Sequence, residues 1–183
     1  MKNITTPLTD EVISSLKAGD EVAISGIVYT ARDAAHKRLC QLIEKKEKLP
    51  ISIQGQIFYF VGPTPARPGK IIGSAGPTTS GRVDNFSPIL LTAGLKGMIG
   101  KGYRSDAVRD ALKKYCAVHF AALGGAGALL NQYIISAEIV AYEDLGTEAI
   151  RKLEIKDFPA IVAYDSFGNS VYDMKGATKT QKH

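Results

Sequence analysis

The chain has 183 residues, of which 45% are apolar and 22% are charged, and it carries a formal net charge of +5. This length supports a sizeable core, and the composition excludes a disordered or fibrous chain. No apolar run reaches the roughly 20 residues of a membrane span, and the N-terminus lacks the basic-then-apolar pattern of a secretory signal. We therefore expect a cytoplasmic protein without membrane contact, with one domain over residues 1–174 and a frayed polar tail at 175–183.

The charged residues and the cysteines narrow the possible classes of protein further. Acids and bases are interspersed, as in residues 44–48 (EKKEK), which is typical of a solvated helix face and not of a nucleic-acid surface. The positive surplus fits a small anionic substrate or an acidic partner equally well. Cys40 and Cys116 have no further Cys or His at metal-ligand spacing, so this chain alone carries no zinc or iron–sulfur motif and no disulfide framework. We expect both thiols to be buried.

The first half of the chain predicts alternating helices and strands. Thr9 and Asp33 each precede a helical apolar pattern and are expected to cap it. In order, the expected elements are a helix at 10–17, a strand at 21–29, a helix from Asp33 to before Pro50, a strand at 51–61, a loop at 62–70 and a strand-like pair at 71–72.

The second half continues this alternation without any internal repeat. In order, we expect a helix at 84–95, a short strand at 98–99, a helix capped by Ser105, a buried strand at 116–122, a strand at 139–142, a helix at 144–153 and a hairpin pairing 160–164 with 170–172. His119 is expected to be a core histidine, and His36 a packed or solvent-facing one. The mixture of adjacent strands and strand–helix–strand units indicates an α/β domain with a mixed sheet packed on helices.

Three donor-rich points each follow a predicted strand. The longest is residues 73–82 (GSAGPTTSGR), which combine glycines, hydroxyls and Arg82, and the others are Arg32 and Lys101. Such groups offer hydrogen-bond donors and positive charge, and suit a carboxylate or phosphate. In open α/β sheets ligands gather where strands end, so all three points are expected to meet at one anion, most naturally a dicarboxylate.

Simpler interpretations remain open for the same residues. The 73–82 stretch also fits a surface loop whose hydroxyls cap turns, and Arg32 and Lys101 also fit solvated side chains. The glycine-rich residues 124–127 lack the G-x-G-x-x-G spacing and the P-loop Lys-Ser/Thr pair, so they favour a nucleotide site only weakly. None of the three donor-rich stretches contains a histidine, cysteine or paired carboxylate, which indicates half of an active site rather than a whole one.

Several motifs together resemble a known family. They are GPTTSGRVD at 76–84, MIGKG at 98–102, GG at 124–125, EDLGTEAI at 143–150 and DFPA at 157–160, ahead of Asp165. The set resembles the β subunit, or C-terminal half, of class I fumarate hydratases and the related L-tartrate dehydratases. It covers nearly the whole chain in the right order. Details such as Ser80-Gly81-Arg82 look more like fumarases than tartrate dehydratases, and Val83 is a conservative departure from the pattern.

This resemblance implies a swivelling β/β/α domain that pairs with an α subunit. It implies that three cysteines of the α subunit hold a [4Fe–4S] cluster, while this chain binds the dicarboxylate substrate through Arg32, Thr78, Thr79, Arg82 and Lys101. Thr78 is similar to the threonine proposed to remove the proton from C3 of malate. The implied reaction is the reversible hydration of fumarate to L-malate in the tricarboxylic acid cycle. The implied assembly is a hetero-oligomer of the two subunits, and self-association of the isolated β chain is compatible with it.

Two alternatives stand beside this interpretation. The substrate of the same mechanism would be L-tartrate in a tartrate dehydratase. A non-catalytic module that binds an anion or docks onto a partner would also use these donor-rich loops. Activity that requires both chains distinguishes an enzyme subunit from such a module.

Overall fold

The computed structural model describes residues 1–123 and 127–174. Its strands are β1 (Lys2–Thr5), β2 (Glu21–Thr30), β3 (Ile57–Tyr59), β4 (Gly97–Gly100), β5 (Val118–Ala122), β6 (Ile134–Ala141) and β7 (Ile150–Tyr164). Its α-helices are α1 (Asp10–Ser14), α2 (Asp33–Glu44), α3 (Ser87–Thr92), α4 (Asp106–Lys114), α5 (Gly127–Leu130) and α6 (Val171–Met174). Short 3₁₀ turns lie at Ser80–Val83, Asn131–Tyr133 and Glu143–Glu148.

The strands form a closed circuit. Strands β2, β3, β4 and β5 pair in parallel in this order, and β7 pairs antiparallel with both β5 and β2. Strand β1 extends one edge of β2 in parallel, and β6 pairs antiparallel with the first part of β7. The predicted mixed α/β architecture is therefore confirmed.

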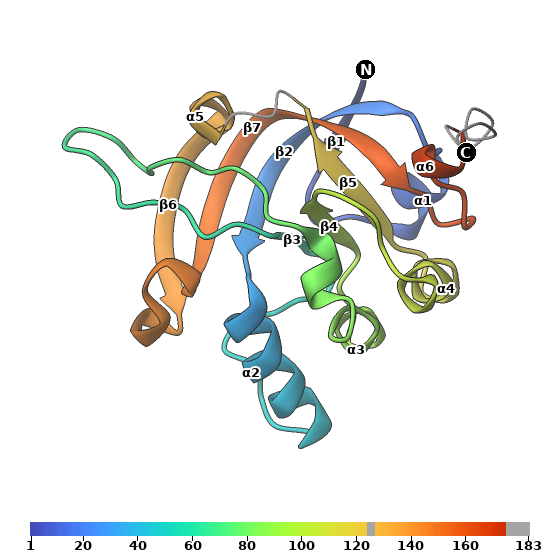
Figure 1. Ribbon diagram of the computed structural model, residues 1–183, viewed down its shortest axis with the longest axis horizontal. Coiled ribbons are helices and arrows are strands. Elements are labelled where there is room, and N and C mark those ends of the chain that lie inside the picture. The colour runs from blue at the N-terminus through green and yellow to red at the C-terminus, as the bar shows by residue number, and fades with distance from the viewer. Residues whose placement is uncertain (124–126, 175–183) are drawn as a thin grey trace, which may run out of the picture.

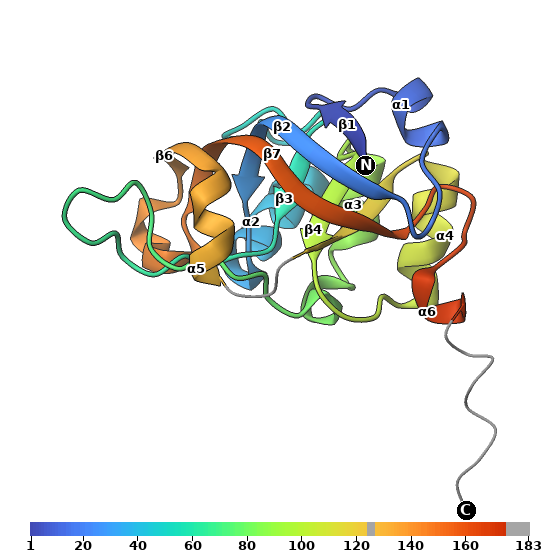
Figure 2. The same ribbon diagram turned by 90° about the horizontal axis from the view of Figure 1, so that it is seen from above.

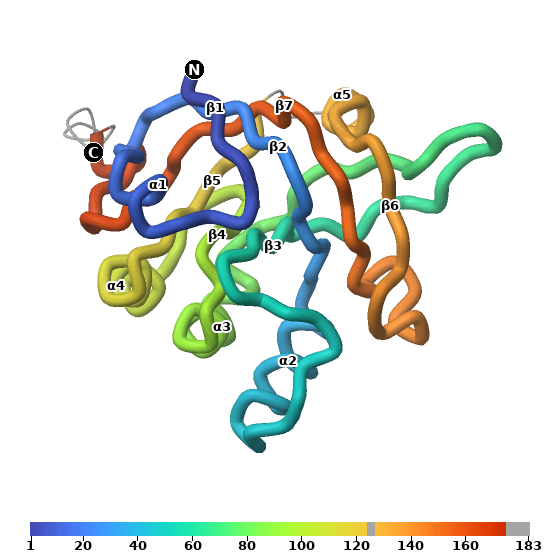
Figure 3. The backbone as a smooth tube through the Cα atoms, turned by 180° about the vertical axis from the view of Figure 1, so that it is seen from behind, coloured from blue at the N-terminus to red at the C-terminus, as the bar shows by residue number. Residues whose placement is uncertain are grey.

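Two apolar clusters fill this architecture because side chains alternate along each strand. On β3, Ile57 and Tyr59 join Phe158 of β7 in the cluster inside the strand circuit. The neighbouring Phe58 points the other way, into a second cluster with residues of α2, α3 and α4 such as Leu39. These three helices lie together on one side of the strands (Figure 1), and the view from behind shows the same arrangement (Figure 3).

The prediction of a helix at 144–153 is wrong. Residues 143–148 form a 3₁₀ turn, and Ile150 begins the 15-residue strand β7. Leu153 and Ile155 are buried whereas Glu154 and Lys156 are exposed, so the segment follows the two-residue period of a strand. Pairing with β2 on one edge and with β6 and β5 on the other holds it extended. In Figure 2, β7 and β2 run side by side across the top of the molecule.

The predicted C-terminal hairpin is present only in part. Tyr164 pairs with Ser170 in a single bridge, and the residues that follow form α6 instead of a return strand. Asp165 closes the intervening turn, because its Oδ1 accepts hydrogen bonds from the backbone N–H groups of Phe167 and Asn169 at 2.9 and 3.0 Å. The predicted tail at 175–183 lies outside the described residues.

Other boundaries shift by smaller amounts. Of the strand expected at 51–61, only Ile57–Tyr59 forms a strand, and residues 71–72 do not form one. Strand β6 begins at Ile134, five residues before the expected start at 139. The expected helix at 84–95 is a 3₁₀ turn followed by α3. Arg32, not Asp33, occupies the N-cap position of α2. The caps of α1 and α4 are confirmed, since Thr9 and Ser105 accept hydrogen bonds from the N–H groups of Val12 and Val108.

Within the described ranges, no helix combines the length and the apolar character needed to cross a membrane.

Phe158→Ala tests the inner cluster. The Phe158 side chain is fully buried, and its ring centroid lies 5.4 Å from that of Tyr59. We expect the substitution to lower the free energy of unfolding by about 3–5 kcal/mol, because it removes buried area and leaves a cavity. Phe167→Ala is the control, since this ring is 47% exposed. Denaturant titration measures both, and equal losses in the two variants would contradict the assignment of Phe158 to the core.

Candidate anion-binding site

Arg32 stands where β2 passes into α2. Its backbone is extended at the N-cap of the 12-residue helix α2. The side chain packs along Gly62, where an added Cβ would lie 3.0 Å from Arg32 Cδ and 3.1 Å from Nη1, so a larger residue at 62 would displace it. Arg32 Nε is buried and finds no hydrogen-bond partner in the described part of the chain. A guanidinium with an unused donor at a helix N-terminus suits an anionic ligand.

The loop that carries Thr78 and Thr79 is tied to the ends of β3 and β4. Both the N–H and the Oγ1 of Thr78 donate to the carbonyl oxygen of Phe60, at 2.7 and 3.0 Å. Thr79 forms a parallel bridge with Lys101, and the N–H of Ser80 donates to Lys101 O at 2.8 Å. Lys101 follows β4 directly and is exposed. The loop therefore places Thr79 beside the backbone of Lys101 and fixes the Thr78 hydroxyl against the end of β3.

Arg82 connects this loop to the corner occupied by Arg32. It lies in the 3₁₀ turn at Ser80–Val83, and its Nε donates to Asp33 Oδ2 at 3.0 Å while Nη2 lies 2.9 Å from the same oxygen. The Arg82 side chain remains 55% exposed, so this ion pair contributes little to stability and leaves donors free for a ligand. The structure thus brings Arg82 next to the residue that follows Arg32.

All the residues predicted for the site lie at one edge of the sheet, where the parallel strands end. Because β2, β3 and β4 are parallel, their carboxyl ends meet there, and Arg32, the Thr78–Thr79 pair with Arg82, and Lys101 each lie at or against one of these ends. The result is three cations and two threonine hydroxyls, with Asp33 as the carboxylate that pairs with one of the cations. Such a set favours a ligand with more than one negative oxygen.

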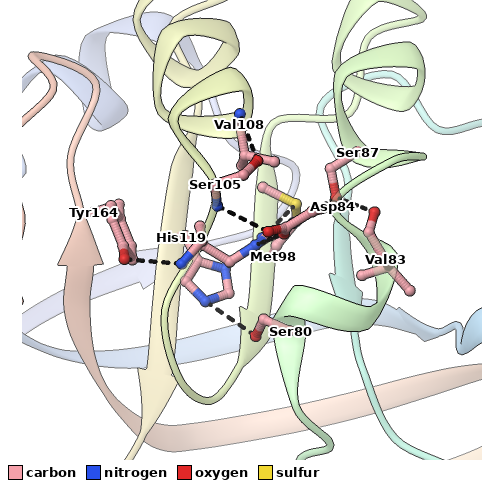
Figure 4. Close-up of polar contacts among 10 residues, drawn as sticks. Ser80, Val83, Asp84, Ser87, Met98, Ser105, Val108, His119 and Tyr164 are labelled. Carbon is pink, nitrogen blue, oxygen red and sulfur yellow. Dashed lines mark hydrogen bonds and ion pairs between the residues drawn. The ribbon is translucent and has the colours of Figure 1, made fainter.

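A buried polar network beneath the loop is not predicted by the sequence. Arg104 is 6% exposed, and its guanidinium contacts Asp84, Ser87, His119 and Met98. These four partners are labelled in Figure 4. Burial lowers the pKa of Arg104, and the neighbouring carboxylate of Asp84 acts in the opposite direction. The expectation of a core histidine at 119 is confirmed, but nothing in the local sequence indicates a buried arginine at 104.

His36 supports the Arg32 corner from below. It is fully buried, its Nδ1 lies 2.7 Å from the carbonyl oxygen of Arg32, and its ring meets those of Phe58 and Phe60 edge-on. Burial lowers the pKa of His36 to about 4, so the ring is neutral and Nδ1–H donates to the carbonyl. Of the two states expected for His36, packed or solvent-facing, the structure has the packed one, and its contact with Arg32 O was not predicted.

The described residues do not form a metal-cluster site. No group of three or more His, Cys, Asp or Glu side chains in residues 1–123 and 127–174 is arranged to hold a metal ion. Cys40 is buried, whereas Cys116 is partly exposed, which corrects the expectation that both are buried. The thiol of Cys40 faces Phe86 O and that of Cys116 faces Ser14, in different parts of the fold. Residues 124–126 of the glycine-rich stretch lie outside the described residues.

Together the fold and the site define a mixed α/β domain with a cationic, hydroxyl-rich edge. The chain belongs to the fumarase C-terminus family, whose model matches residues 2–175. It is 37% identical over 174 residues to the anaerobic class I fumarate hydratase of Escherichia coli, covering 94% of this chain and 31% of that protein. It is 34% identical over 162 residues to fumarate hydratase 2 of Leishmania major, covering 87% of this chain and 28% of that one.

A third relative has nearly the same length as this chain. It is a provisionally named L(+)-tartrate dehydratase subunit beta from Methanocaldococcus jannaschii, 35% identical over 172 residues, with 91% of this chain and 88% of the relative covered. The chain thus spans about a third of the length of the fumarate hydratases it matches, and most of the length of the beta subunit.

The buried histidines predict a pH dependence of stability. The folded-state pKa of His36 is about 4, and burial with the charge of Arg104 places that of His119 well below its usual 6.5. Below pH 6.5 the unfolded chain therefore binds protons that the folded chain does not, and stability falls as the pH falls. Each histidine should remove about 1 kcal/mol between about pH 7 and pH 5.5.

Urea titrations at these two pH values measure the effect. His36→Gln, which cannot titrate in this range, should reduce the loss by about half. An unchanged loss in this variant would contradict the neutral, buried state of His36.

Proposed function

We propose that this chain is the β subunit of a two-chain, iron–sulfur-dependent fumarate hydratase of the cytoplasm, which interconverts fumarate and L-malate in the tricarboxylic acid cycle. The observation that carries the proposal is the convergence of Arg32, Arg82 and Lys101 with the Thr78–Thr79 loop at one edge of the sheet. Family membership and the names of the fumarate hydratase relatives support it.

In this proposal the three cations and Thr79 bind the substrate carboxylates. Arginine forks match a carboxylate with two parallel hydrogen bonds, and the lysine adds a point charge. Removal of the C3 proton of malate builds negative charge that spreads into the adjacent carboxylate. Cations already held in place stabilise that charge without reorganisation, which lowers the barrier.

Thr78 is the proposed proton-transfer residue. Its hydroxyl donates to Phe60 O at 3.0 Å, so the oxygen lone pairs remain available to accept a proton from the substrate. A threonine hydroxyl is only weakly basic, and the surrounding positive charge is expected to help by stabilising the deprotonated substrate rather than by strengthening the base. The Phe60 carbonyl fixes the direction in which the hydroxyl points.

An α subunit would complete the active site. The iron–sulfur cluster implied by the resemblance would belong to that partner, since the described residues of this chain offer no set of ligands for it. A relative that this chain matches over most of its length is named as a beta subunit, which supports a separate partner chain.

L-Tartrate is the second candidate substrate. The relative that this chain matches over most of its length carries the name of a tartrate dehydratase beta subunit. Tartrate has the same two carboxylates and an additional hydroxyl, so the same cationic edge would bind it. The choice between the substrates then depends on contacts to that hydroxyl.

Anaerobic co-expression with the candidate α subunit, followed by cluster reconstitution, tests the proposal. The complex is assayed for dehydration of L-malate and L-tartrate in parallel, with each chain alone as the control. Fumarate formation that requires both chains is the expected result. Preferential dehydration of tartrate would assign the second substrate, and a cluster-loaded complex inactive on both would favour a non-catalytic binding module.

Arg82→Ala tests the role of the loop. We expect turnover by the assembled enzyme to fall by at least about a hundredfold, because one preorganised cation is lost. The stability of the chain should change by less than about 1 kcal/mol, since the Arg82–Asp33 pair is exposed.

Arg38→Ala is the matched control for this variant. Arg38 also forms an exposed ion pair, with Asp144 at 2.6 Å, but is not among the site residues. Its kinetics should stay near those of the wild type. Wild-type kinetics for Arg82→Ala would remove Arg82 from the site.

A further inference from the structure

We propose that Arg104 is a positioning residue that fixes both the Arg82 turn and the Lys101 loop in the geometry needed for the ligand. The inference rests on the proposed function of that edge as a dicarboxylate site. It concerns a residue that does not itself belong to the cationic edge, because the Arg104 side chain is fully buried.

All three nitrogens of the Arg104 guanidinium are engaged. Nε donates to Asp84 Oδ1 at 2.7 Å, and Nη2 donates to Ser87 Oγ at 2.5 Å. Nη1 lies 3.2 Å from His119 Nδ1 and 3.3 Å from Met98 Sδ. Figure 4 draws the residues that supply these acceptors, namely Asp84, Ser87, Met98 and His119. The planar fork of arginine is suited to several acceptors in fixed directions.

One side of this network holds the C-terminal end of the Arg82 turn. Asp84 Oδ1 accepts a hydrogen bond from Arg104 Nε, and Asp84 Oδ2 accepts one from the N–H of Ser105 at 2.8 Å. Both oxygens of the carboxylate are therefore held in place. Ser87 Oγ accepts a hydrogen bond from Arg104 Nη2 and donates one to the carbonyl oxygen of Val83 at 3.1 Å. The turn is therefore tied down directly after Arg82.

The other side holds the N-terminal end of the turn and the Lys101 loop. Arginine only donates, so His119 Nδ1 accepts from Arg104 and the ring proton resides on Nε2. His119 Nε2–H then donates to Ser80 Oγ at 3.3 Å, and the N–H of Ser80 donates to Lys101 O. Gly100 permits this approach, because a Cβ there would lie 2.1 Å from Ser80 Oγ.

Fold stability alone gives a weak reason for a buried charge at this place. A buried ion pair commonly stabilises a protein no more than apolar side chains of similar volume would, because both charges lose their hydration. The network instead joins the two segments that carry Arg82 and Lys101. Misplacement of binding groups by about 1 Å is enough to cost about a hundredfold in rate. These facts point to a role in positioning.

Two substitutions test the inference in the assembled enzyme. Arg104→Lys keeps the charge but cannot reach all the acceptors of the fork, and Ser80→Ala removes only the last link, between His119 and the loop. For Arg104→Lys we expect kcat/KM to fall by about a hundredfold, with KM raised about tenfold or more. For Ser80→Ala we expect KM to rise several-fold with an unchanged midpoint of unfolding.

Arg109→Lys is the matched control. Arg109 lies in α4, the helix that follows Arg104, and pairs with Asp173 of α6, but it contacts neither the Arg82 turn nor the Lys101 loop. It should retain wild-type kinetics. Amide hydrogen exchange of the full chain gives a readout that does not depend on activity. Exchange at the Ser80 N–H should become faster in Arg104→Lys and Ser80→Ala, whereas exchange in β7 should not change.

Wild-type KM and kcat in Arg104→Lys would overturn the inference, whatever the exchange shows. If Arg104→Lys fails to fold, Ser80→Ala decides, and wild-type values of KM and exchange in that variant would overturn it. If the unmodified complex is inactive on dicarboxylates, the proposed function fails. Exchange at Ser80 then still tests the network, and unchanged exchange in both variants would overturn it.

Discussion

The parallel pairing of β2, β3 and β4 is the constraint on which the candidate site depends. Parallel strands leave the sheet at the same edge, so residues far apart in the sequence arrive together without long side chains having to reach across the fold. The antiparallel strand β7 closes the circuit by pairing with both β5 and β2. It thereby holds the first and last members of the parallel set in place.

Two buried neutral histidines and the buried Arg104, paired with Asp84, lie beneath the cations at this edge. Phe60 lies between the two buried histidines, with ring centroids 5.2 Å from His36 and 6.2 Å from His119, and its carbonyl receives Thr78. Burial keeps both imidazoles uncharged, so they act as directional hydrogen-bonding groups rather than as additional cations.

In the function proposed above, this edge is half of an active site, and its other half belongs to a partner chain. The fumarate hydratase relatives are about three times longer than this chain, and the tartrate dehydratase beta relative is nearly equal to it in length. The family therefore includes both arrangements of the same domain.

Local chemistry made much of this protein predictable from its sequence. Helix caps such as Thr9 and Ser105 depend on a few adjacent residues, so their positions were confirmed. The composition of the donor-rich 73–82 stretch favoured an anion but also fitted a surface loop, so the anion site remains a prediction. The strand β7 was mistaken in part for a helix because the apolar spacing of residues 144–153 fits both periods, and only pairing with β2 and β6 decides between them.

Tertiary structure alone decided which polar residues support the site. An arginine at position 104 carries no local signal of burial, because its acceptors come from Asp84, Ser87 and His119, up to 20 residues away. A buried charge is tolerated only where such partners converge, and that convergence exists only in the folded chain. The sequence by itself determined which cationic and hydroxyl-rich segments the chain carries, and the fold determined where they meet and what holds them there.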